Sequence, residues 1–184
     1  MPVCHPTRTC LLSGRYPRHQ GNPRWGTYPR LDESQTLARV LQSAGYRTAI
    51  SGKWQLTLLL KDPGQPHRMG FDDYCLFGWH EGPRYHQPMI HQNGKLRTDV
   101  ADRYGPSVYV DYLVDFMKRN KDRPFFVMLS PYMVHIPLQG PKDLVKKYGE
   151  RTQPGEGRHH PTYAAMVEHV DRCVGRLLAG IDRL

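Results

Sequence analysis

The chain has 184 residues, which is the size of one ordinary domain and too short for two full-size ones. Its 39% of hydrophobic residues and 10% of aromatic residues argue against wholesale disorder, and no apolar run approaches the roughly 20 residues that span a bilayer. The 26 Lys and Arg exceed the 17 Asp and Glu, for a formal charge of +9 that favours an anionic partner.

The cysteines disfavour two classes of small domain. Cys4, Cys10, Cys75 and Cys173 include no C-x-x-C pair, so neither a disulfide scaffold nor a zinc knuckle is expected. The first residues also lack the charged start and apolar stretch of a signal peptide. The sequence therefore predicts neither a leader nor a membrane span.

The amino-terminal part predicts a short helix followed by a loop. A helix is expected over residues 5–14, where Pro6 suits the first helical position and Gly14 suits the stop. The stretch 15–33 is rich in Arg, Pro, Gly and Tyr, which is typical of a loop.

A second helix and a buried strand follow. The helix is predicted over about 34–44 with Ser34 as its cap. Its apolar residues fall at i, i+3 and i+4, at Leu37, Val40 and Leu41. The segment 46–51 is predicted as a buried strand that runs into the residues Gly52-Lys53-Trp54.

The rest of the chain continues the alternation of helices and strands. It predicts, in order, a polar broken stretch at 61–72, a strand at 73–78, an irregular stretch at 80–105, a helix at 107–119, a central parallel strand at 124–130, a loop at 149–160 and a helix at 161–182. The last helix keeps an apolar stripe that is expected in the core, namely Tyr163, Met166, Val167, Val170, Val174, Leu177, Leu178 and Ile181.

This alternation predicts an α/β domain with a mainly parallel sheet flanked by helices. Sites in such sheets lie at the carboxyl ends of the strands. Two candidate segments follow predicted strands, at 52–55 and at 132–135.

Cys4 and Arg8 stand at the start of the first predicted helix. A helix N-terminus attracts anions and lowers the pKa of a cysteine placed there, and Arg8 can reach the same anion. The alternative is a half-buried Cys4 with Arg8 in solvent. A phosphatase-type cysteine loop is excluded because it needs an Arg six positions after the Cys, whereas a cysteine protease with His135 as its base stays open.

The segments 4–8 (CHPTR) and 11–17 (LLSGRYP) resemble the signature of the formylglycine-dependent sulfatases, C-x-P-[ST]-R followed by L-L-T-G-R-Y-P. Further segments resemble other elements of that family in the family's order, at 51–54 (SGKW), 70–74 (GFDDY), 124–127 (PFFV), 135–137 (HIP) and 163–175 (YAAMVEHVDRCVG). The resemblance covers essentially the whole chain and implies an alkaline-phosphatase-like fold.

The resemblance implies a sulfuric ester hydrolase with sulfate esters as substrates. Cys4 would be oxidised by a formylglycine-generating enzyme, and a hydroxyl of the hydrated aldehyde, bound to Ca²⁺, would attack the sulfur. Arg8 would steady this group, and Lys53 would bind the sulfate. His135 would bind sulfate or protonate the leaving oxygen. Gln55 stands where many members have His, and it can donate a hydrogen bond but exchange no proton at neutral pH.

The resemblance also implies an incomplete domain. Family members carry one acidic pair well before the Cys and a second acidic pair with a Lys well after the H-x-P element, and this chain contains neither. Residues 1–184 are therefore expected to be a partial sulfatase catalytic domain, truncated at both ends. Cys4, as formylglycine, is its one expected Ca²⁺ ligand, and the isolated chain is expected to be inactive.

An alternative from another class is a basic module that binds nucleic acid or acidic glycans without catalysis. Aromatic residues alternate with the arginines of one stretch, namely Arg15, Arg18, Arg24 and Arg30. The Lys and Arg are nevertheless dispersed along the chain, which argues against nucleic acid.

Several aromatic and histidine residues are secondary candidates. Trp25, Trp54 and Trp79 are expected in packing, although Trp79 and His80 could border a sugar site. One of His86 and His91 could line a substrate pocket, and His159 and His160 are expected in a solvated loop.

Overall fold

A five-stranded sheet forms the centre of the computed structural model, which describes residues 3–20, 31–78, 80–151 and 160–184. The strands follow the order β4-β3-β2-β1-β5. Their bounds are β1 Arg47–Lys53, β2 Asp73–Phe77, β3 His91–Gln92, β4 Lys95–Leu96 and β5 Phe125–Ser130. β1 pairs in parallel with both β2 and β5, whereas β3 and β4 run antiparallel at one edge.

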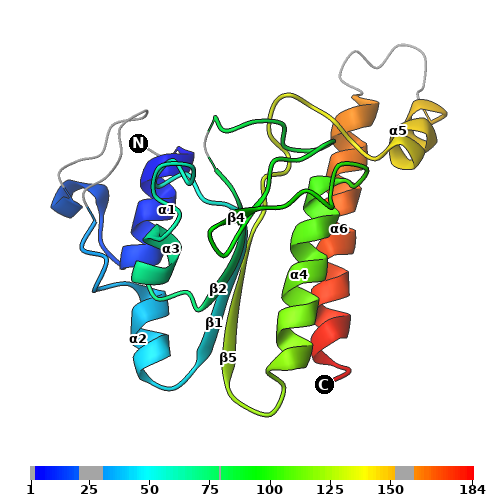
Figure 1. The fold of residues 1–184 in the computed structure, drawn as a ribbon. Coiled ribbons are helices and arrows are strands. Elements are labelled where there is room, and N and C mark those ends of the chain that lie inside the picture. Colours follow the sequence, from blue (N-terminus) through cyan, green and yellow to red (C-terminus); the bar gives the residue numbers. More distant parts are fainter. Residues whose placement is uncertain (1–2, 21–30, 79, 152–159) are drawn as a thin grey trace.

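Helices cover both faces of this sheet (Figure 1). On one side lie α1 (Cys4–Ser13), α2 (Leu37–Ser43) and the short α3 (Gln65–Arg68), with a 3₁₀ turn at Pro17–Gln20. On the other side lie α4 (Gly105–Arg119) and α6 (Pro161–Ile181), and α5 (Lys142–Gly149) packs against α6. The predicted α/β class with a mainly parallel sheet is confirmed.

Two apolar layers hold the helices to the sheet, because successive side chains of a strand point to opposite faces. Ala49 of β1 lies in the layer with Phe116 of α4 and Met166 of α6. The next residue, Ile50, lies in the other layer with Leu12 of α1 and Trp54. All six are at most 3% exposed, and full burial of each large side chain contributes about 1.5–3 kcal/mol.

The first helix begins one residue earlier than the sequence predicts. Val3 is its N-cap, so Cys4 occupies the first helical position rather than preceding the helix. Gly14 ends the helix as predicted, with φ of 67° in the left-handed region that favours glycine.

The predicted start and face of the second helix are wrong. Thr36 is the N-cap of α2 and its side chain accepts a hydrogen bond from the Arg39 N–H at 3.1 Å, while Ser34 hydrogen-bonds Asp32. Leu37 and Val40 are 46% and 64% exposed, and the small Ala38 is the buried residue of this helix. Periodicity alone overestimated the width of the buried face, because the neighbouring elements decide which apolar side chains are covered.

The stretch 80–105 contains a hairpin that the prediction missed. β3 and β4 are joined by Asn93 and Gly94, whose φ angles of 47° and 85° are both positive. Asn-Gly is the pair that such two-residue turns prefer. The strands are two residues each, too short for hydrophobic alternation to reveal them.

Two predictions about the second half need correction. β5 is parallel but lies at the edge of the described sheet rather than at its centre. The stripe of α6 is not core throughout: Met166 is buried, whereas large apolar residues of the predicted stripe are between 44% and 57% exposed, namely Tyr163, Val167, Val174, Leu178 and Ile181. An apolar pattern indicates which face of a helix can be buried, but it does not indicate which neighbouring element covers that face. Within the described residues, no helix combines the length and the apolar character that crossing a bilayer requires.

Candidate active site

A small cavity of about 70 Å³ opens where β1, β2 and β5 end. Its lining comes from the start of α1, the end of β1 and the second residue after it, the end of β2, the loop that follows β2, and the segment after β5. The lining residues are Cys4, Lys53, Gln55, Phe77, His80, Arg84, Tyr132 and His135. The predicted segments 52–55 and 132–135 thus meet at one place, as expected for the carboxyl ends of parallel strands.

The end of β1 is shaped to bring Lys53 and Gln55 to this cavity. Gly52 has φ of 111°, and a Cβ there would lie 2.0 Å from the backbone oxygen of Ser130 on β5. Only glycine allows the two strands to approach so closely. Gln55 adopts a φ of 62°, which is uncommon for a residue with a side chain and is typical of functional sites.

Arg8 lies beside the cavity and joins three elements. Its Nη1 donates to the Lys53 carbonyl oxygen at 2.9 Å and also hydrogen-bonds the Ser130 hydroxyl. That hydroxyl donates in turn to the Lys53 carbonyl at 2.9 Å. Arg8 therefore fixes the backbone of Lys53 and is not among the cavity-lining residues. Its ability to reach an anion beside Cys4 stays a prediction.

Cys4 and Lys53 perturb each other electrostatically. Burial raises the pKa of the Cys4 thiol, but the charge of Lys53, hydrogen bonds from Gln55 and the His5 backbone, and the charge of Arg8 together bring this pKa below its ordinary value. Burial lowers the pKa of Lys53 to about 8, against the opposing effect of Cys4. Lys53 is only 5% exposed, so its ammonium gains from any anion that enters the cavity.

The imidazole of His135 is oriented by backbone groups. Its Nδ1 lies 2.8 Å from the Ile136 carbonyl oxygen, and because a carbonyl only accepts, Nδ1 carries the hydrogen. Tyr85 holds the same residue: its hydroxyl donates to the His135 carbonyl at 2.8 Å and accepts from the His135 N–H at 3.2 Å. For the second ring nitrogen, Nε2, no hydrogen bond to a described residue is found, so it can serve a ligand in the cavity.

Sequence reasoning missed three residues of this site. Tyr132 and Phe77 form an aromatic wall, with ring centroids 5.3 Å apart, and Arg84 lies over both rings. Tyr132 belongs to a predicted segment, but nothing singled out its ring. Arg84 could have been found from the sequence, because it is a cation in a Gly- and Pro-containing loop that follows a predicted strand.

The secondary histidine candidates have mixed outcomes. His80 lines the cavity, and a sugar site beside it stays a prediction. His91 does not line it and instead pairs with Glu81, with 3.1 Å between Nε2 and Oε2 and both side chains 3% exposed. His86 packs against Tyr104, with ring centroids 5.2 Å apart.

The ring nitrogen Nδ1 of His160 accepts from the Tyr163 N–H at the start of α6. The remaining predictions of this kind, on Arg24, Trp25, Arg30, Trp79 and His159, lie outside the described residues.

The cavity does not match the donor set that calcium needs. Ca²⁺ takes six to eight oxygen ligands, mostly carboxylate and carbonyl. None of the described residues that line the cavity is Asp or Glu, and the described part of the chain holds no cluster of three metal-ligating side chains. The residues present thus do not fit a calcium ion.

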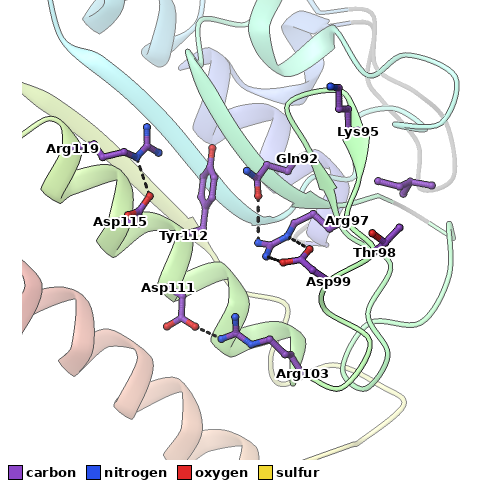
Figure 2. Close-up of a pocket in the computed structure, with 11 residues that line it drawn as sticks. Gln92, Lys95, Arg97, Thr98, Asp99, Arg103, Asp111, Tyr112, Asp115 and Arg119 are labelled. Carbon is purple, nitrogen blue, oxygen red and sulfur yellow. Dashed lines mark hydrogen bonds and ion pairs between the residues drawn. The ribbon is translucent and has the colours of Figure 1, made fainter.

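A larger cavity, of about 580 Å³, lies at the other edge of the sheet, between β4 and α4 (Figure 2). Its walls carry cations that are already paired: Arg97 with Asp99, Arg103 with Asp111, and Arg119 with Asp115. Among the described residues, none that was predicted for chemistry lines it. The smaller cavity at the strand ends is therefore the candidate active site.

Comparison with known proteins finds similarity to sulfatases at the level of the family model and of individual relatives. A family model described as Sulfatase matches residues 1–184. The N-acetylglucosamine-6-O-sulfatase of Bacteroides thetaiotaomicron is 32% identical over 133 residues, covering 71% of this chain and 22% of the relative. The N-acetylgalactosamine-6-sulfatase of Canis lupus familiaris is 26% identical over 217 residues, covering 100% and 38%.

Solved structures agree with these similarities. The structure of Ps i-CgsB in complex with k-i-k-neocarrahexaose has a TM-score of 0.82 at 25% identity, covering 99% of this chain and 45% of that one. The structure of BT4656 in complex with its substrate D-glucosamine-2-N,6-O-disulfate has a TM-score of 0.69 at 27% identity, covering 84% and 30%. The chain thus spans less than half the length of each of these four relatives.

Proposed function

The chain belongs to the sulfatase family, as its signature segments predicted, and we propose that it carries part of the catalytic site of a sulfuric ester hydrolase. One observation supports this proposal above others: Cys4, Lys53, Gln55 and His135 line a single cavity although they come from three separate parts of the chain. Residues 1–184 would then form a partial sulfatase catalytic domain.

Cys4 is proposed as the precursor of the nucleophile. A formylglycine-generating enzyme would convert it, and the hydrated aldehyde would supply the oxygen that attacks sulfur while the sulfur–oxygen bond to the alcohol breaks. Thr7 follows Pro6 in the C-x-P-[ST]-R signature, so the segment 4–8 meets the pattern for this conversion. The start of α1 contributes its dipole and N–H groups to an anion held there.

Lys53, Gln55 and His135 would handle the sulfate ester itself. The buried Lys53 ammonium offsets the charge of the sulfate oxygens, and the Gln55 amide donates a hydrogen bond to one of them. His135 would act in its imidazolium form: Nδ1 keeps the proton that it donates to the Ile136 carbonyl, and the proton on Nε2 passes to the leaving oxygen. Gln55 cannot share this proton transfer, which leaves His135 as the acid.

The substrate class follows from the family and is narrowed by its named members. Sulfate esters are the general class, and the relatives named for N-acetylglucosamine and N-acetylgalactosamine sulfates make sulfated saccharides the first to examine. The isolated chain is proposed to bind such esters without turning them over, because none of the described residues that line the cavity is a carboxylate.

Binding of phenyl sulfate tests this proposal. We expect wild-type chain to bind it, and Lys53→Met to weaken binding at least about tenfold, since the buried ammonium is lost. Affinity should also fall as the pH rises above the Lys53 pKa of about 8. Arg123→Met, which removes an exposed cation from the turn before β5, is the matched control. Equal affinity of wild type and Lys53→Met would overturn the proposal.

Conversion and turnover are tested separately. After co-expression with a formylglycine-generating enzyme, the tryptic peptide that contains Cys4 should show the mass of the aldehyde. Hydrolysis of 4-nitrophenyl sulfate by this protein should be undetectable. Calcium-dependent hydrolysis that disappears in Cys4→Ala would show the proposed inactivity to be wrong.

A further inference from the structure

Arg84 is a cation at the candidate active site to which the proposed chemistry gives no role. It lies in the loop between β2 and β3 and lines the same cavity as Cys4 and Lys53. Its guanidinium carbon lies 4.7 Å from the ring centroid of Tyr132 and 5.4 Å from that of Phe77. Stacking on aromatic rings holds the planar group in one orientation and leaves its edge available for hydrogen bonds.

The hydrogen-bonding capacity of Arg84 is mostly unused by the described residues. Nη1 donates to the Ile136 carbonyl oxygen at 3.0 Å, but no described carboxylate forms an ion pair with this side chain. By contrast, Arg68, Arg97 and Arg103 each pair with an Asp. A guanidinium carries five N–H donors, so most of those of Arg84 remain for a ligand.

Arg84 and Lys53 face the cavity from different depths. Lys53 is 5% exposed, whereas Arg84 is half-buried and lies farther out. The Lys53 ammonium is 5.2 Å from the centroid of the same Tyr132 ring. The two cations are therefore at most about twice that distance apart, and the positive charge of Arg84 contributes to lowering the pKa of Lys53.

A ligand with one anionic group would satisfy the inner cation and leave the outer one unpaired. Resting on the proposed function, we propose that Arg84 is a specificity-determining residue that binds a second anionic group of the substrate. The substrate class is then a sulfate ester that carries a carboxylate or a second sulfate a few bonds from the reacting sulfate. The fork of Arg84 matches either group with two parallel hydrogen bonds.

Calorimetry with phenyl sulfate and its 3-carboxy and 4-carboxy derivatives tests this inference, because the three esters share one ring and differ in the second anion. Wild-type chain should bind the better carboxylated ester at least about tenfold more tightly than phenyl sulfate. This selectivity ratio should fall to near one in Arg84→Met. Arg84→Gln should lower the ratio in the same way, although its amide can still donate to the Ile136 carbonyl. Arg123→Met should keep the wild-type ratio.

The outcomes separate the two proposals. A ratio near one in wild type, or an undiminished ratio in both Arg84 variants, overturns the role of Arg84 alone, provided that phenyl sulfate still binds through Lys53. If phenyl sulfate does not bind, or binds equally to Lys53→Met, the proposed function fails and the inference fails with it. Thermal unfolding of each variant shows whether it is folded. If Arg84→Met is not folded, Arg84→Gln alone decides the outcome.

Discussion

Lys53 is the residue on which the electrostatics of the candidate site depends. Its side chain is buried beside Cys4, and its backbone carbonyl accepts hydrogen bonds from both Arg8 and Ser130. The buried cation stabilises the thiolate form of Cys4 and lowers the pKa of that thiol. The geometry therefore favours a reactive group at position 4 even before any modification.

The reactivity of the unmodified thiol can be measured directly. Iodoacetamide should label Cys4 faster than Cys75 or Cys173 near neutral pH, because burial raises the pKa values of those two thiols to about 12 and about 11. Lys53→Met should slow the labelling of Cys4 about fivefold, since the stabilising charge is lost. Peptide mass spectrometry gives the rate at each cysteine, and an unchanged Cys4 rate in Lys53→Met would contradict this account.

At the scale of the element, β1 carries the site because of one glycine. Gly52 lies opposite Ser130 in the parallel register, and its missing side chain lets β5 approach. Lys53 then ends the strand beside Phe77 of β2, and Gln55 follows two residues later. A single backbone position thus sets where two cavity residues project.

Gly52→Ala should be strongly destabilising. The added Cβ would meet the Ser130 carbonyl oxygen at 2.0 Å and would force an alanine to a φ of 111°. We expect the free energy of unfolding in urea to fall by about 2 kcal/mol or more. Gly175→Ala is the matched control: it lies in α6 with nothing within 4 Å and should stabilise by up to about 1 kcal/mol. Similar losses in both variants would argue against strand approach as the cause.

The loop between β2 and β3 is anchored by Glu81. Its Oε1 accepts from the Leu60 N–H at 2.8 Å, and its Oε2 lies 3.1 Å from His91 Nε2. This buried pair fixes the chain between His80 and Arg84, both of which line the cavity. The pair therefore positions cavity residues without itself lining the cavity.

Glu81→Ala should leave the buried His91 ring and the Leu60 N–H, which lies on an exposed residue, without their partner. The expected loss is about 2–3 kcal/mol in urea unfolding, with faster hydrogen exchange at the Leu60 amide. Glu150→Ala, which removes an exposed ion pair of 3.9 Å with Lys146, should change stability by less than about 0.5 kcal/mol. Unchanged exchange at Leu60 in Glu81→Ala would contradict the anchoring role.

At the scale of the whole molecule, acid should weaken the fold in two steps. Burial lowers the pKa values of His5, His91 and His169 below the ordinary value of 6.5. Their neutral forms stabilise the folded state fully above that value, so stability falls as the pH drops through and below it. Hydrogen bonds from Arg97 lower the pKa of Asp99 to about 2, so a second loss begins below about pH 4.

Urea midpoints measured from about pH 7.5 down to about pH 3 test this expectation. The midpoint should decrease as the pH falls through and below about 6.5, and Asp99 should add a further decrease below about pH 4. The first decrease should persist in high salt, because salt screens repulsion among exposed cations but screens buried histidines much less. A midpoint that rises on acidification would contradict the assignment of these groups.

Particular elements show how much of the fold the local sequence pattern can predict. The apolar spacing of α4 and the continuous apolar run of β5 were each sufficient to predict the element, since hydrophobic periodicity reflects local geometry. The signature segments predicted the family, and the rule for strand ends predicted that residues 52–55 and 132–135 meet. The local pattern did not predict three features: the cap of α2, the two-residue strands on either side of Asn93-Gly94, and the exposed face of α6.

The sequence by itself determined the alternation of helices and strands, the family, and the candidate site residues Cys4, Lys53, Gln55 and His135, which line one cavity. Only the tertiary structure decided that Arg8 binds a backbone carbonyl instead of lining the cavity, and that Arg84 completes the cavity wall. The physical reason is that helix and strand periods are local properties, whereas a side chain's partner is set by whichever element packs across from it. That neighbour can be distant in sequence, as Ser130 is from Arg8.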